Sequence, residues 1–103
     1  MEIKKITGDS FQTEVTEAGM PVLVEFYREG CKSCEAQFPI LEKAAVEACD
    51  VKFCRVSLDD DPQLAQRFDI TVVPAMLILN GEKIFRTMTG FQSLESVLES
   101  LEM

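Results

Sequence analysis

Two cysteines three positions apart are the residues of this sequence best suited to covalent chemistry. Cys31 and Cys34 lie in the stretch REGCKSCEAQFP, residues 28 to 39, directly after an apolar run and at the start of a helix-like stretch. A sulfur in the first turn of a helix meets free backbone N–H groups and the positive end of the helix dipole, which favour the thiolate. Lys32 adds positive charge beside it. We therefore expect the pKa of the Cys31 thiol to lie below its ordinary value of about 8.5.

The expected exposure of the two sulfurs differs, and disulfide exchange requires such a difference. Cys34 lies one turn inside the helix on its apolar stripe and should be shielded. A thiolate at Cys31 attacks the disulfide of a substrate, and the thiol of Cys34 then resolves the mixed disulfide. A CxxC pair beside a βαβ pattern is a signature of redox proteins, so the sequence predicts a thiol-disulfide oxidoreductase.

Two other interpretations of the cysteines remain open from the spacing. The four cysteines form C-x2-C-x14-C-x4-C, close to the spacing of a four-cysteine zinc site. That site requires a non-helical chain after Cys34, because a continuous helix would put Cys49 about 27 Å from Cys31. The other interpretation is that Cys31 and Cys34 are two helix residues without chemical consequence. We expect Cys49, on the helix stripe, and Cys54, in a strand, to be small core residues.

The hydrophobic pattern predicts the elements that position these cysteines. Their order is β α β α β α β β α, which favours an α/β fold with a central mixed sheet and helices on both faces, in one domain spanning residues 1–103. The expected elements are a helix at 9–18 capped by Asp9, a buried strand at 21–27, a helix from Cys31 through Pro39 to Cys49, a strand at 51–58, a short helix within 59–68, a hairpin that turns at Asn80-Gly81, and a helix capped by Ser93.

Charge and hydropathy exclude several classes of partner. Ten Lys and Arg residues against 18 Asp and Glu residues give a formal net charge of −8, which repels nucleic acid and anionic membrane surfaces. The longest apolar run, VVPAMLIL, is too short to cross a bilayer, and the N-terminus lacks the apolar stretch of a signal peptide. We therefore expect a cytoplasmic protein that binds neither nucleic acid nor membrane.

Four features, in order and spacing, resemble the thioredoxin family over nearly the whole chain. They are VLVEFYREGCKSC at 22–34, Pro39 in the following helix, VVPAMLILNGEKI at 72–84, and Gly90. The resemblance implies the thioredoxin fold and reduction or exchange of disulfides in protein substrates. It also implies recycling by a flavin-containing, thioredoxin-reductase-like donor, with no bound cofactor beyond the redox-active Cys31–Cys34 disulfide. We expect the protein to be a monomer.

The resemblance also implies which residues bind the substrate. A cis peptide bond should precede Pro74, which should lie against Cys31 and leave the Val73 backbone free to pair with an extended substrate segment, with Gly90 beside the substrate groove. The alternative for Pro74 is an ordinary edge-strand proline. Gly30 stands where the family has a tryptophan, so the substrate surface beside Cys31 should be flatter. A redox-inactive adaptor of the same fold is the alternative function that Gly30 suggests.

Glu25 occupies the place of the family's buried acid. A carboxyl in so apolar a strand should either stay protonated at a raised pKa or find a cation, and Arg55 on the next core strand is the obvious cation. In one interpretation Glu25 relays the proton of Cys34 during resolution. In the other, Glu25 and Arg55 are only a structural ion pair.

Overall fold

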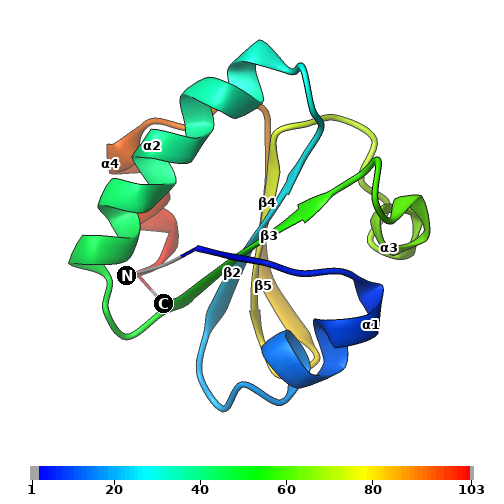
Figure 1. Ribbon diagram of the computed structural model, residues 1–103. Coiled ribbons are helices and arrows are strands. Elements are labelled where there is room, and N and C mark those ends of the chain that lie inside the picture. Colours follow the sequence, from blue (N-terminus) through cyan, green and yellow to red (C-terminus); the bar gives the residue numbers. More distant parts are fainter. Residues whose placement is uncertain (1–2, 103) are drawn as a thin grey trace.

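The computed structural model describes residues 3–102, which form a mixed sheet with helices packed on both faces (Figure 1). The element order matches the expected β α β α β α β β α, with one π-helical segment, η1, directly after the first helix. None of the helices in this range is long and apolar enough to cross a membrane. The elements are β1 (Lys4–Lys5), α1 (Gly8–Phe11), η1 (Gln12–Thr16), β2 (Val22–Tyr27), α2 (Lys32–Glu47), β3 (Lys52–Ser57), α3 (Pro62–Arg67), β4 (Ala75–Asn80), β5 (Lys83–Thr89) and α4 (Leu94–Ser100).

Strand β2 occupies the middle of the five-stranded sheet, whose order is β1-β3-β2-β4-β5. It is parallel to β3, which is parallel to β1, and antiparallel to β4, which forms an antiparallel hairpin with β5. Every residue of β2 is buried, as expected for a strand covered on both faces. The loop after β2 therefore leaves the sheet at its centre.

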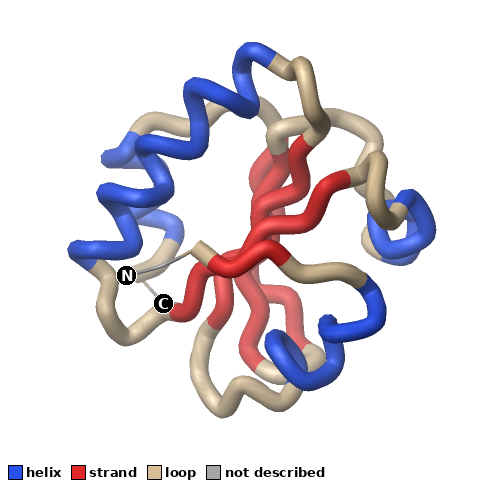
Figure 2. Tube along the Cα trace, viewed as in Figure 1, coloured by secondary structure: helices blue, strands red, loops and turns tan. Residues whose placement is uncertain are grey.

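Helices α2 and α4 cover one face of the sheet, and α1, η1 and α3 cover the other (Figures 1 and 2). Alternate strand residues divide between two apolar cores. Leu23 and Phe53 belong to the core under α2, whereas Cys54 belongs to the opposite core. Because side chains two positions apart on a strand share a face, Glu25 and Arg55 point to the α2 side.

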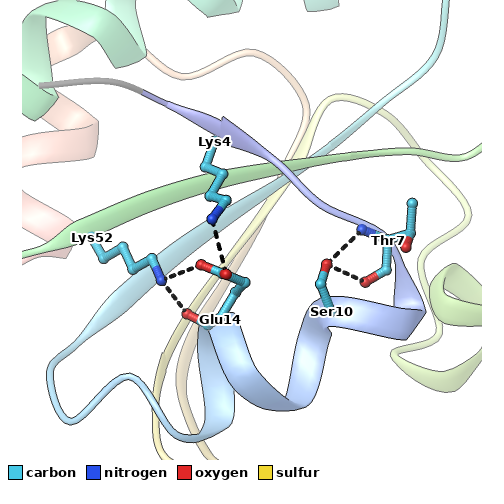
Figure 3. Close-up of polar contacts among 5 residues, drawn as sticks. All are labelled: Lys4, Thr7, Ser10, Glu14 and Lys52. Carbon is cyan, nitrogen blue, oxygen red and sulfur yellow. Dashed lines mark hydrogen bonds and ion pairs between the residues drawn. The ribbon is translucent and has the colours of Figure 1, made fainter.

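The first helix differs from the expected span 9–18 in its cap and its form. Thr7 is the N-cap residue instead of Asp9, and its backbone N–H donates to Ser10 Oγ across 3.3 Å (Figure 3). Asp9 instead lies in the first turn, where a carboxylate is favoured by the helix dipole. The α-helix ends at Phe11, and η1 extends the turn as far as Thr16.

The hairpin turn differs from the expected one by a single residue. Asn80 still pairs with Lys83, so the two loop residues are Gly81 and Glu82 rather than Asn80-Gly81. Gly81 has a φ of 65°, and Asp69 is the one non-glycine residue of the described chain with a positive φ. A positive φ at the first loop residue alone is the pattern of a type II′ turn, not of type I′.

Glu14 ties η1 to the parallel edge of the sheet (Figure 3). Its carboxylate accepts hydrogen bonds from Lys4 Nζ at 2.9 Å and Lys52 Nζ at 2.7 Å, and Lys52 Nζ also donates to the Glu14 carbonyl at 2.8 Å. These two cations hold the pKa of Glu14 below its usual value. The contacts fix the helical layer that lies opposite α2.

Candidate active site

The loop after β2 brings the cysteine pair to the start of α2. Gly30 has a φ of 77°, a left-handed conformation that glycine adopts without strain, and the Cys31 N–H donates to the Arg28 carbonyl at 3.3 Å. Cys31 is the N-cap residue of α2, and its Sγ accepts a hydrogen bond from the Cys34 N–H at 3.2 Å. The sulfur therefore satisfies one of the free donors at the helix start, as the sequence indicated.

Cys31 and Cys34 form a disulfide, and their Cα atoms are 5.2 Å apart. Cys31 is partly exposed, whereas Cys34 is only 2% exposed. Ser33 Oγ lies 3.4 Å from Cys31 Sγ, and the side chain of Lys32 is exposed. The structure is therefore that of an oxidised dithiol in which Cys31 is partly exposed and Cys34 is buried.

Glu25, two residues before the end of β2, is completely buried. Its Oε1 accepts a hydrogen bond from Arg55 Nε at 3.2 Å, and its Oε2 has no hydrogen-bond partner among the described residues. Burial raises the pKa of Glu25 to about 7, although the charge and hydrogen bond of Arg55 lower it. Arg55 is thus the cation that the sequence predicted, but the effect of burial on the pKa of Glu25 is larger than the opposite effect of Arg55.

A pocket of about 260 Å³ opens beside Cys34. The guanidinium of Arg55 lies 3.7 Å from the ring centroid of Tyr27 and 4.2 Å from that of Phe38, so that it stacks against both rings. Because Arg55 bonds to Glu25 and also lines the pocket, it connects the buried carboxyl to the surface near Cys34. The lining residues are Tyr27, Arg28, Glu29, Gly30, Cys34, Glu35, Phe38 and Arg55.

The other expected substrate-binding residues lie at the same end of the sheet as the cysteine loop. Ala75, the first residue of β4, pairs with Phe26 near the end of β2. The Val73–Pro74 peptide bond directly before it is cis, as the resemblance implied. The Gly90 N–H donates to the Pro74 carbonyl at 2.7 Å, which brings the end of β5 to the same place.

Gln37 is a buried polar residue that the hydrophobic pattern does not indicate. It lies on α2 three residues after Cys34 and is 0% exposed. Its Oε1 accepts from the Gln92 N–H at 2.7 Å, and its Nε2 donates to the Gln92 carbonyl at 3.0 Å. The sequence does place a polar residue among the buried positions of the helix, which could have indicated a buried hydrogen bond. It does not indicate the partner, because Gln92 is 55 residues away in the sequence.

Neither free cysteine belongs to the site. Cys54 is buried as expected, and burial raises the pKa of its thiol. The expectation for Cys49 is wrong, because it is exposed. Helix α2 ends at Glu47, and Ala48 has non-helical backbone angles, so Cys49 no longer follows the buried stripe. Within residues 3–102, no group of three or more His, Cys, Asp or Glu side chains is arranged to hold a metal ion.

Comparisons with known proteins agree with this geometry. The family model described as Thioredoxin matches residues 2–103. A protein named Thioredoxin from Rickettsia prowazekii is 33% identical over 99 residues, covering 94% of this chain and 93% of its own length. Thioredoxin M4, chloroplastic, from Arabidopsis thaliana is 30% identical, covering 99% of this chain and 53% of its own length. The crystal structure of chloroplastic thioredoxin z superposes with a TM-score of 0.85 at 22% identity, covering 96% of this chain and 90% of that one.

Proposed function

This chain belongs to the thioredoxin family and is a dithiol thiol-disulfide oxidoreductase, and on that premise we propose distinct roles for its two active-site sulfurs. Cys31 is the nucleophile, and Cys34 is the resolving cysteine. The observation that carries the proposal is the disulfide at the start of α2, in which Cys31 is partly exposed and Cys34 is 2% exposed.

The reaction begins from the reduced pair and consumes one substrate disulfide. The Cys31 thiolate attacks one sulfur of that disulfide, which breaks the S–S bond, forms a mixed disulfide and releases the first substrate thiolate. Deprotonated Cys34 then attacks Cys31 Sγ, which breaks the mixed disulfide and releases the second thiolate. Two electrons pass to the substrate, and the protein ends with the Cys31–Cys34 disulfide seen in the structure.

Hydrogen bonding supports Cys31 as the first sulfur to react. In the oxidised form its Sγ already accepts the Cys34 N–H at 3.2 Å. When the disulfide is reduced, the same donor and the helix dipole stabilise a thiolate at this position. Cys34, on the buried face of the first turn, has no access to a bulky substrate and meets only the mixed disulfide beside it.

We assign Glu25 to the proton transfer that the second step requires. A carboxyl with a pKa of about 7 is present in both protonation states at neutral pH, which is the condition for an effective general acid or base. Its Oε2 is free of hydrogen bonds within the described chain and is available to a proton or a water molecule. Glu25 would accept the proton of Cys34 as that thiol attacks.

The backbone of Val73, held by the cis bond to Pro74, is the proposed docking strand for an extended substrate segment. Gly90, whose N–H is bonded to the Pro74 carbonyl, forms the adjoining side of the groove. Gly30 leaves room beside Cys31, and the exposed side chain of Lys32, the residue after Cys31, is the proposed contact for the substrate on this side of the disulfide.

The family implies disulfide substrates and a reductase that regenerates the dithiol. We propose that this reductase carries a flavin, and that the present chain functions as a monomer in the cytoplasm without a bound metal or organic cofactor. A net charge of −8 supports partners with basic surfaces rather than nucleic acid.

Reduction of insulin by dithiothreitol tests the proposed function. Catalytic amounts of the protein should accelerate precipitation of the insulin B chain, and Cys31→Ser should abolish the acceleration. The matched control is Cys49→Ser, which removes an exposed thiol outside the site and should leave the rate unchanged. A wild-type rate equal to that of dithiothreitol alone would reject the function.

A further inference from the structure

A short segment without helix or strand joins β5 to α4 and is hydrogen-bonded to the cis-proline loop. It spans residues 90–93, and two sets of hydrogen bonds hold it. At its start, the Gly90 N–H donates to the Pro74 carbonyl at 2.7 Å. Two residues later, both backbone polar groups of Gln92 bond to the side chain of Gln37. The segment is therefore tied to the cis-proline loop at one point and to the active-site helix at another.

On the helix side, the segment is held by Gln37, which we call the anchor and which is a polar side chain in a fully buried position. The Gln37 side chain is 0% exposed, and its amide uses its oxygen and its nitrogen on a single residue of a distant segment. An apolar residue would fill this position on the buried stripe without the cost of dehydrating an amide. Gln92 in turn folds its own side chain back, with Nε2 donating to the Thr89 carbonyl at 3.2 Å and Oε1 accepting from Ser96 Oγ at 2.6 Å.

The anchor Gln37 lies on the same helix as the resolving cysteine, Cys34. Gln37 follows Cys34 by three residues, which is about one helical turn, so both side chains lie on the same face of the helix. The amide thereby fixes the distance between the disulfide and the segment. Between the two tied residues lies Phe91, an aromatic side chain that is 48% exposed.

We propose that Gln37 is a positioning residue that holds Gly90 and Phe91 in register with the disulfide, so that a protein substrate contacts both at once. This inference rests on the proposed function, because it concerns how that same site selects extended polypeptide disulfides. A small disulfide reaches Cys31 without contacting the segment. Gln37 therefore affects the reaction with protein disulfides and leaves the reaction with small disulfides unchanged.

The test compares two substrates in three proteins. Reduced wild type, Gln37→Leu and Val97→Ala are mixed with insulin or with 5,5′-dithiobis(2-nitrobenzoate), and the second-order rate constants are measured by stopped flow. Val97 is completely buried in α4, so its truncation is a matched control for lost stability without loss of the anchor. Misplacement by 1 Å can cost about a hundredfold in rate, and for the insulin reaction of Gln37→Leu we expect a loss of about tenfold.

The small disulfide should react with Gln37→Leu at the wild-type rate, and Val97→Ala should keep the wild-type ratio between the two substrates. An insulin rate that is unchanged, or equal losses for both substrates, would overturn the proposal. If wild type reacts with neither disulfide, the proposed function itself fails.

Amide hydrogen exchange in the wild type tests the anchor without any variant. The Gln92 N–H, bonded to Gln37 at 2.7 Å, should exchange more slowly than the neighbouring Phe91 N–H in the reduced protein. Equal exchange of the two amides would overturn the proposal even if Gln37→Leu does not fold.

Discussion

Arg55 donates a hydrogen bond from Nε to Oε1 of Glu25 across 3.2 Å, while its guanidinium stacks on the rings of Tyr27 and Phe38. The arginine is thus held by aromatic contacts as well as by the carboxylate. Its favourable charge does not fully offset the burial of Glu25, whose pKa is raised to about 7. The pair therefore has a titratable member in the physiological range, which a fully compensated ion pair would lack.

Replacing Arg55 by Met should raise the pKa of Glu25 further, above about 7. The substitution removes the cation that lowers this pKa and keeps an unbranched side chain between the two rings. Titration of the ¹³C-labelled Glu25 carboxyl by NMR measures the effect. Arg28→Met is the matched control, because Arg28 lines the same pocket but pairs with Asp59, and it should leave the Glu25 pKa in place.

Replacing Glu25 by Gln should slow complete turnover at pH 7 by about a hundredfold, the lower end of what general acid–base catalysis contributes. The first attack of Cys31 should stay nearly intact, because Glu25 is assigned to the deprotonation of Cys34. Single-turnover kinetics with a labelled disulfide separates the two steps. Glu35→Gln, at an exposed position on the same pocket, should react as wild type. Unchanged turnover in Glu25→Gln would remove Glu25 from the mechanism.

The raised pKa of Glu25 also makes stability depend on pH. Between pH 4.5 and about 7 the folded chain binds a proton at Glu25 that the unfolded chain has lost, so the stabilisation present below pH 4.5 decreases as the pH rises through this window. The difference in pKa corresponds to at most about 3 to 4 kcal/mol. Urea unfolding of the oxidised protein from pH 4 to 8 should show this decrease relative to Glu25→Gln. Parallel pH profiles for the two proteins would contradict it.

Replacing Cys34 by Ser should trap the mixed disulfide between Cys31 and a protein substrate. The resolving thiol is absent, and nothing else in the site displaces the substrate. Non-reducing electrophoresis after incubation with insulin should show a covalent adduct, and dithiothreitol should cleave this adduct by reducing its mixed disulfide. Cys31→Ser should form no such adduct. Equal adduct formation by both variants would show that attack is not confined to Cys31.

The hydrophobic pattern of the sequence was sufficient to predict much of the fold and the main features of the site. The apolar run of β2, followed by two cysteines and a helical stripe, correctly predicted that Cys31 lies at the start of α2 and that Cys34 is buried. The cis bond at Pro74 came from the family resemblance alone, because local sequence does not determine which proline bonds are cis.

The wrong predictions share a physical cause: they concern positions where a local pattern ends. Cys49 continues the helical spacing of α2, but the helix stops at Glu47, and end positions depend on contacts that periodicity does not contain. Gln37 is a different case: it lies inside α2, and no prediction singled it out, because its hydrogen-bond partner is 55 residues away in the sequence. In the hairpin, Gly81 occupies the first turn position instead of the second, a shift of one residue that leaves the strand pattern unchanged.

The exposed position of Cys49 offers an internal standard for the redox state of the chain. With Cys31 and Cys34 joined, the folded protein presents one thiol to an aqueous reagent, and unfolding it without a reductant adds a second at Cys54. Reduction before unfolding brings the total to all four cysteines. Counting the thiols that react at each stage therefore gives the fraction of molecules in the oxidised form. The free thiols of Cys49 and Cys54, present in either redox state, serve as the reference.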